Sequence, residues 1–188
     1  RLNSSAASDV YKRQDIHGGI VKVLDFLNAT MNDANCKGLI RMECVEKAAD
    51  VIASVAFGGE DDEKNKDITA KIATTLMDCN GMETLINASE EYTGENDIPQ
   101  LKAMCSVWKA FGNVTCISTT DDLVTSKKRG IDIFDTGIDA MSQLKSIVGD
   151  IASEILEQIF CTFFNIVLNN CVTKKYFQDK NIHSKCLE

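Results

Sequence analysis

The stretch GMETLI at residues 81–86 sets the pattern of this chain, because it places a glycine directly before an apolar helical stripe. The same opening recurs as GIVKVL at residues 19–24 and as GIDAM at residues 137–141. Each opening is followed by a longer apolar segment, and these segments end in AFGG (56–59), AFGNV (110–114) and VLNNC (167–171). Such self-similarity is typical of repeat folds.

Helical spacing also dominates the rest of the sequence. The chain holds a single proline, strand-like alternation is nearly absent, and apolar residues recur three and four positions apart, as from Val45 to Ile52. Asp97 before Pro99 favours a helix start, since aspartate caps free N–H groups and proline is tolerated in the first turn. We therefore predict an all-α fold, with helices near residues 17–33, 39–58, 67–78, 82–92, 98–115, 121–129, 138–148, 151–170 and 173–182.

A shorter helix is expected before the second and third glycine openings, at residues 68–77 and 123–128. A unit of short helix, glycine turn, helix and longer helix resembles the armadillo repeat, with its G-I-x-x-L second helix and its A-L-x-N-L ending on the third. The resemblance implies an α–α superhelix, an armadillo-like solenoid of about three irregular repeats. The spacing of about 54 to 62 residues exceeds the usual period of about 40 to 47. An irregular helical bundle or a HEAT-like pairing of helices is the alternative.

The glycine of each unit is expected to permit a sharp turn and a close approach of the next helix. Helices should stop at Gly81 and Gly130. Residues 58–67 (GGEDDEKNKD) are expected to form an acidic loop inserted between helices. This loop does not match a calcium site, because the glycine and the glutamate needed at its sixth and twelfth places are missing.

The chain divides into a leader and one domain. Residues 1–14 contain a run that resembles the scar found at the start of translated transcript-library sequences, so we expect a non-native or disordered leader. Residues 15–188 should form one armadillo-like helical repeat domain. Because residues 172–188 resemble the first helix of a further unit, we expect this domain to be truncated at its C-terminal end.

The charge and composition of the chain limit the classes of partner that it is expected to bind. The net charge of -8 and the pI of about 4.8 should repel phosphate backbones and anionic lipid, so neither nucleic acid nor membrane is expected. The most apolar stretch, residues 159–168, is shorter than the ~18 residues that a transmembrane helix needs. Eight cysteines occur without a C-x-x-C pair, and Cys44, Cys105 and Cys161 lie among apolar residues. We expect free thiols that act as small buried hydrophobes, in a cytoplasmic or nuclear protein.

No group of residues with catalytic spacing stands out. His17 and His183 lie far apart in the sequence, and neither has a Cys or Asp at triad or ligand spacing. Phosphate-binding and dinucleotide-binding motifs are missing as well. We therefore expect no enzyme, metal site or cofactor. The function expected is a protein–protein interaction scaffold that binds a peptide or protein surface in the groove of stacked helices. A helical regulatory subunit that packs in an obligate complex is the alternative.

The armadillo resemblance also implies candidate binding residues. In armadillo proteins the third helices line a concave groove, where an asparagine near each helix end can hydrogen-bond an extended peptide. Asn113 and Asn170 occupy the matching positions, with Lys109 and Trp108 nearby. Trp108 lies one residue earlier than the groove tryptophan of the nuclear import receptors, so import-signal binding is not expected.

The orientation of the two asparagines follows from helix geometry. Phe111 and Leu168 should point into the core, and a residue two positions further along a helix is rotated by about 200°. Asn113 and Asn170 should then face a common surface. Helix capping by the asparagines, and burial of Trp108 between repeats, are the competing interpretations.

Overall fold

A computed structural model describes residues 4–57, 63–91, 97–116, 127–147, 149–169 and 171–185. Within these ranges the chain is all-helical and contains no strand, which confirms the all-α part of the predicted fold class. The helices are α1 (Ser4–Asn32), α2 (Gly38–Ala56), α3 (Glu63–Asp78), α4 (Gly81–Glu90), α5 (Ile98–Cys116), α7 (Lys127–Leu144), α8 (Asp150–Asn169), α9 (Cys171–Asp179) and α10 (Ile182–Lys185).

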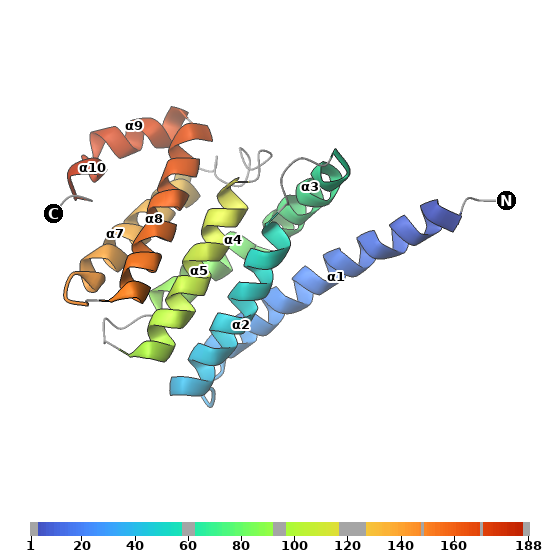
Figure 1. The fold of residues 1–188 in the computed structure, drawn as a ribbon, viewed down its shortest axis with the longest axis horizontal. Coiled ribbons are helices and arrows are strands. Elements are labelled where there is room, and N and C mark those ends of the chain that lie inside the picture. Colours follow the sequence, from blue (N-terminus) through green and yellow to red (C-terminus); the bar gives the residue numbers. More distant parts are fainter. Residues whose placement is uncertain are drawn as a thin grey trace.

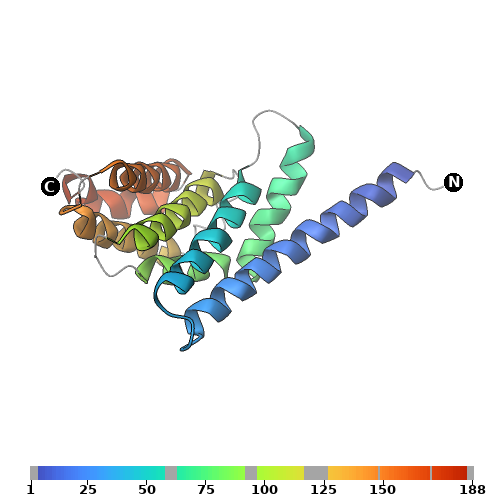
Figure 2. The same ribbon diagram turned by 60° about the horizontal axis from the view of Figure 1, so that its bottom comes forward.

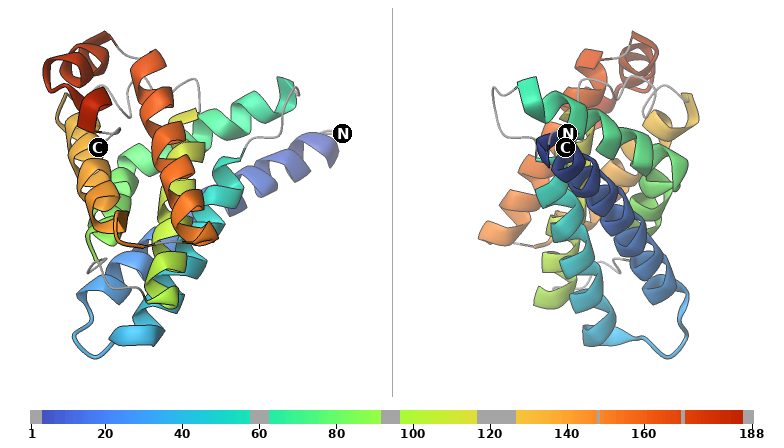
Figure 3. Two further views of the ribbon diagram at one scale, coloured as in Figure 1. Left: turned by 60° about the vertical axis from the view of Figure 1, so that its left-hand side comes forward. Right: turned by 90° about the vertical axis from the view of Figure 1, so that its right-hand side faces the viewer.

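The helices form two layers. In the front layer α2, α5 and α8 lie side by side and run in the same direction (Figure 1). Behind them α1, α4 and α7 follow one another, and α4 contacts both of the others (Figure 2). Helix α3 packs on α1 and α4, and α9 covers α7 and α8 at one end of the molecule (Figure 3). The middle of the chain therefore holds a three-helix unit, α3–α4–α5.

Aromatic side chains fill the core where the two layers meet. Trp108 and Phe111 of α5 are fully buried, with ring centroids 5.1 Å apart. Phe134 of α7 lies 5.0 Å from Phe163 of α8 and 5.4 Å from Phe177 of α9. Phe134, Phe163 and Phe177 come from three different helices, and Trp108 lies against Gly137 of α7, so these rings hold α5, α7, α8 and α9 together.

The turn between α3 and α4 behaves as the repeat pattern predicts. Asn80 adopts a left-handed conformation with φ 52°, and α4 begins at Gly81. A Cβ atom on Gly81 would lie 2.8 Å from Leu76 Cδ2 and 3.0 Å from the Leu76 carbonyl oxygen. Only glycine permits this approach, so the glycine turn is confirmed for the middle unit.

The other glycine openings are not turns, and here the sequence prediction is wrong. Gly130 and Gly137 both lie inside the continuous helix α7, where helices 121–129 and 138–148 were expected. A Cβ on Gly137 would collide with the ring of Phe163 and lie 3.1 Å from Trp108. Gly137 thus provides close packing between helices, not a bend. Gly19 lies inside α1 with open space around it.

Helices α1 and α3 begin earlier than predicted. Helix α1 starts at Ser4 and therefore takes in residues assigned to the leader. Its first half projects away from the other helices (Figure 1). Helix α3 starts at Glu63, so residues 63–67 of the expected acidic loop are helical. The rest of that loop, residues 58–62, lies outside the described ranges.

Candidate functional site: the open face of α2, α5 and α8

The front layer leaves one face of three parallel helices uncovered. Helix α5 is flanked by α2 and α8 and backed by α4, so only a narrow stripe of its side chains reaches solvent. Lys102 and Lys109 form the middle of this stripe, and their spacing of seven places them on one side of the helix. We define the open face by these lysines and by the two carboxylates that share the electrostatic environment of Cys105 with Lys109, Asp50 of α2 and Glu154 of α8.

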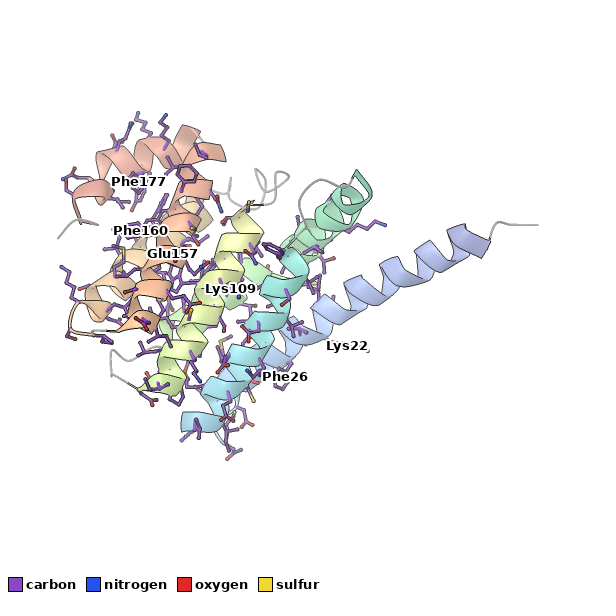
Figure 4. The ribbon with its side chains drawn as sticks, viewed as in Figure 1. Lys22, Phe26, Lys109, Glu157, Phe160 and Phe177 are labelled. Carbon is purple, nitrogen blue, oxygen red and sulfur yellow. The ribbon has the colours of Figure 1, made fainter. Side chains whose placement is uncertain are left out.

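Charge alternates across the open face. Cys105 of α5 lies between the helices, and its thiol is within electrostatic reach of Asp50 on α2, Lys109 on α5 and Glu154 on α8. The lysines thus run along the centre, with acidic side chains on both sides. Figure 4 shows Lys109 on α5 and Glu157 on the neighbouring helix α8. The arrangement presents alternating charge rather than one continuous acidic surface.

Cys105 is the chemically distinctive group beneath this face, but it is not a nucleophile. Burial and the negative charge of Glu154 raise the pKa of its thiol from 9.0 to about 12, and the thiol also hydrogen-bonds Glu154. The reactive form of cysteine is the thiolate. Cys105 therefore remains protonated at neutral pH and acts as a buried donor.

Asn113 does not point freely into solvent. Its side-chain Nδ2 donates a hydrogen bond of 2.9 Å to the backbone carbonyl of Ala53 on α2, and the residue is partly buried. This bond joins two neighbouring helices and does not cap the end of its own helix. The amide that the sequence analysis assigned to a bound peptide is instead used between α5 and α2.

Asn165 of α8 repeats this arrangement, which the sequence analysis missed. Its Nδ2 donates 3.0 Å to the carbonyl of Gly112 on α5 and lies 3.3 Å from Thr115 Oγ1. Asn113 and Asn165 are each the sixteenth residue of their helix, and each follows a buried phenylalanine by two positions. The pattern Phe-x-Asn, at residues 111–113 and 163–165, is the signal that could have identified this pair.

The expected partner of Asn113 was Asn170, which lies outside the described residues. Its expected orientation required Leu168 to point into the core. That expectation is wrong, because Leu168 is 64% exposed. On α8 the core positions are Ile159, Phe163 and Ile166. The alignment of the third unit was therefore shifted by five residues, from Phe163 and Asn165 to Leu168 and Asn170.

Trp108 and Lys109 have opposite environments. Trp108 is fully buried, so it belongs to the core and its assignment as a partner contact is corrected. Its indole Nε1 has no hydrogen-bond partner among the described residues. Lys109, one position further, is exposed on the open face as the sequence analysis expected. Among the three candidate residues that the structure describes, Lys109 is exposed, Asn113 is partly buried and Trp108 is buried.

The thiols differ in exposure. Seven cysteines lie within the described ranges, and the six whose side chains are described form no disulfide bond. Cys105 is buried and Cys44 is half-buried, but Cys161 is exposed, so the expectation of a buried Cys161 is wrong. Among the described residues, no group of three His, Cys, Asp or Glu side chains could hold a metal ion.

Helix α8 is more apolar than the sequence analysis expected. Over Asp150–Leu168 it has the length and the mean hydropathy, 1.5, of a helix that could cross a membrane. The stretch that the sequence analysis considered, residues 159–168, was too short, because apolar residues begin at Ile151 and flank both Glu154 and Glu157. A third of this segment, 33%, is buried inside the fold, where α8 packs on α5. Core helices of soluble proteins pass the same test.

The comparisons with known proteins found no match: no family model, no curated protein and no solved structure resembles this chain.

Proposed function

We propose that this chain is an armadillo-like solenoid that serves as a non-catalytic protein-interaction scaffold and binds its partner on the open face. The observation that carries the proposal is the parallel stack of α2, α5 and α8, which leaves one continuous, charged surface uncovered. Stacked long helices of this kind provide extended binding surfaces in repeat proteins.

The order of the helices supports the solenoid. Helices α2, α5 and α8 correspond to third helices, and α1, α4 and α7 correspond to second helices behind them. Helix α3 takes the place of a first helix in the middle unit, and the Asn113 and Asn165 bonds recur at equivalent positions. These similarities are geometrical, so they support the assignment at the level of architecture.

The charges of the open face favour a cationic partner segment. Acidic side chains from α2 and α8 flank Lys102 and Lys109, so a segment crossing the layer would meet acid, base and acid in turn. The net charge of -8 adds attraction for a positively charged partner. Complementary charges of this kind determine specificity and association rate more than affinity.

A charge-reversal series tests this proposal. Peptides that differ in Lys and Arg content are titrated by fluorescence polarisation against wild type, Asp50→Lys and Glu154→Lys. We expect basic peptides to bind and each reversal to weaken binding about ten-fold or more, because like charges then oppose each other. Glu90→Lys, at an exposed site on α4 in the back layer, should leave the affinity unchanged. Equal binding by all four proteins would refute the open face as the site.

A further inference from the structure

Two cysteine thiols meet where the chain turns from α1 into α2, at the lower end of the molecule (Figure 1). Cys36 lies in this turn, and Cys44 lies in the second turn of α2. Both residues are half-buried, and their thiols are close enough for a hydrogen bond between them. Because each residue keeps part of its surface in solvent, a small molecule can reach the pair.

Arg41 of α2 holds the turn that carries Cys36 in place. Its Nε donates a hydrogen bond of 2.7 Å to the Cys36 carbonyl oxygen, and its Nη2 donates 3.1 Å to the carbonyl oxygen of Asp33. Arg41 precedes Cys44 by three positions, so both side chains leave the same side of α2. The third contact of the guanidinium is an ion pair of 2.8 Å with Glu91, directly after α4. Arg41 therefore keeps the turn against the side of α2 from which Cys44 projects.

The turn has the freedom that a covalent bond between the two sulfur atoms requires. A disulfide bond is about 2 Å long, so hydrogen-bonded thiols must move closer before their sulfur atoms can join. Cys36 lies outside both helices, and its neighbours Asn35 and Lys37 are exposed. Its backbone can therefore shift toward Cys44 without unwinding a helix.

We propose that Cys36 and Cys44 form a redox modification site, a dithiol that a small disulfide such as glutathione disulfide oxidises reversibly to a disulfide bond. In the first step the thiolate of Cys36 attacks one glutathione sulfur and displaces the other as a thiolate, which leaves a mixed disulfide on Cys36. In the second step the thiolate of Cys44 attacks the Cys36 sulfur and displaces the remaining glutathione. One glutathione disulfide is reduced to two glutathione molecules, which take up the two protons of the protein thiols.

The environment of Cys44 determines the order of the two attacks. Burial raises the pKa of the Cys44 thiol, and the neighbouring Cys36 and Glu43 raise it further. The thiolate is the form that attacks a disulfide, so Cys44 reacts slowly with a molecule from solution. Its attack on the mixed disulfide is intramolecular, and the proximity of the two sulfur atoms offsets the small fraction of thiolate.

Oxidation would fasten the junction of α1 and α2 by a second means besides Arg41. A disulfide from residue 36 to residue 44 closes a short loop and restricts the unfolded chain, which stabilises the folded state. The oxidised protein should therefore melt about 5 °C above the reduced protein. Cys36→Ser should melt at the same temperature with and without glutathione disulfide, because it cannot form the bond.

Peptide mapping without reduction identifies the bond directly. The protein is equilibrated with reduced and oxidised glutathione, alkylated with iodoacetamide and digested with trypsin. Lys37 and Arg41 lie between the two cysteines, so trypsin separates them, and the disulfide appears as residues 23–37 joined to residues 42–47. We expect this linked peptide in wild type and in Cys161→Ser, which lacks an exposed thiol elsewhere. Cys36→Ser and Cys44→Ser should lack it.

Dilution of the glutathione buffer separates an internal disulfide from simple attachment of glutathione. Forming the internal bond consumes one glutathione disulfide and releases two glutathione molecules. At a fixed ratio of the two, a ten-fold dilution of both should therefore raise the ratio of disulfide to dithiol about ten-fold, whereas a mixed disulfide would not respond. Glutathione on Cys36 or Cys44 without the linked peptide, a ratio that ignores dilution, or a linked peptide found only in covalent dimers would each overturn the proposal.

Discussion

Asn113 and Asn165 join the three front helices through their side-chain amides. Each donates to a backbone carbonyl of the preceding helix, Ala53 and Gly112 respectively. Each carbonyl also accepts a bond from its own helix, Ala53 from the Phe57 N–H and Gly112 from Thr115 Oγ1, so the amide adds a second donor from a neighbouring helix. The amides therefore fix the register between neighbouring helices.

Replacing either asparagine by alanine should lower the free energy of unfolding by about 1 kcal/mol, the net contribution of a typical hydrogen bond. This expectation reverses the one that followed from spacing alone, in which both side chains were free. Urea unfolding provides the measurement, and Asn87→Ala at an exposed site on α4 is the matched control. If Asn113→Ala and Asn165→Ala are as stable as the control, the amide bonds do not hold the layer together.

Cys105 predicts a specific pH dependence of stability. Burial and Glu154 raise the pKa of the thiol in the folded protein from 9.0 to about 12. In the unfolded chain the thiol has its ordinary pKa, so it ionises at a lower pH than in the folded protein. Between the two pKa values, loss of the proton therefore stabilises the unfolded state relative to the folded state. The contribution of Cys105 is thus fully present below about pH 9 and is lost as the pH rises toward 12.

The comparison of wild type with Cys105→Ala at pH 8 and pH 10 isolates this effect. The wild type should lose more stability between the two pH values than the variant, because only the wild type carries the shifted thiol. Urea unfolding at both pH values gives the two differences. The same loss in both proteins would show that the Cys105 thiol is not shielded from solvent.

At the scale of helices, the sequence predicted α2, α4, α5 and α8 to within a few residues. These helices carry unbroken apolar stripes, and Asp97 with Pro99 marks the start of α5 at Ile98. The prediction failed at α7 because a glycine can act either as a turn or as a packing site, and local sequence does not distinguish the two. The collision that a Cβ on Gly137 would make with Phe163 exists only in the folded structure.

Gly137→Ala and Gly19→Ala form a matched pair that tests this interpretation. Alanine favours helix over glycine by about 1 kcal/mol, so Gly19→Ala, with open space around it, should stabilise the protein. Gly137→Ala should instead destabilise it by about 1–3 kcal/mol, the usual cost of overpacking a core. Thermal unfolding measures both. A Gly137→Ala protein that melts above wild type would contradict the close packing of α7 on α8.

The candidate site was harder to predict than the helices. Lys109 was placed correctly because it follows directly from the exposed stripe of α5. Trp108 is buried, and the partner of Asn113 was misplaced because a shift of five residues along α8 rotates the position by about 140° and moves a different residue to the surface. Leu168 is exposed while Phe163 is buried, and Phe163 points inward because its ring packs on Phe134 of α7 and Phe177 of α9.

At the scale of the whole molecule, exposed charged side chains and exposed apolar side chains lie on different surfaces of the front layer. The open face presents alternating charge across three parallel helices, while the outer helices of that layer also expose large apolar side chains, Phe160 and Phe164 on α8 and Ile40 and Val51 on α2.

The central claim, that the open face is the binding surface, is tested most directly by an NMR footprint. A 20.7 kDa protein labelled with ¹⁵N is titrated with a basic peptide selected by the polarisation assay, and the shift of every backbone amide is followed. The account predicts that the largest shifts lie at Asp50, Lys102, Lys109 and Glu154 and on their helical turns, with α1 and α4 unaffected. Shifts concentrated on α1 and α4, with the amides of α5 unchanged, would contradict it.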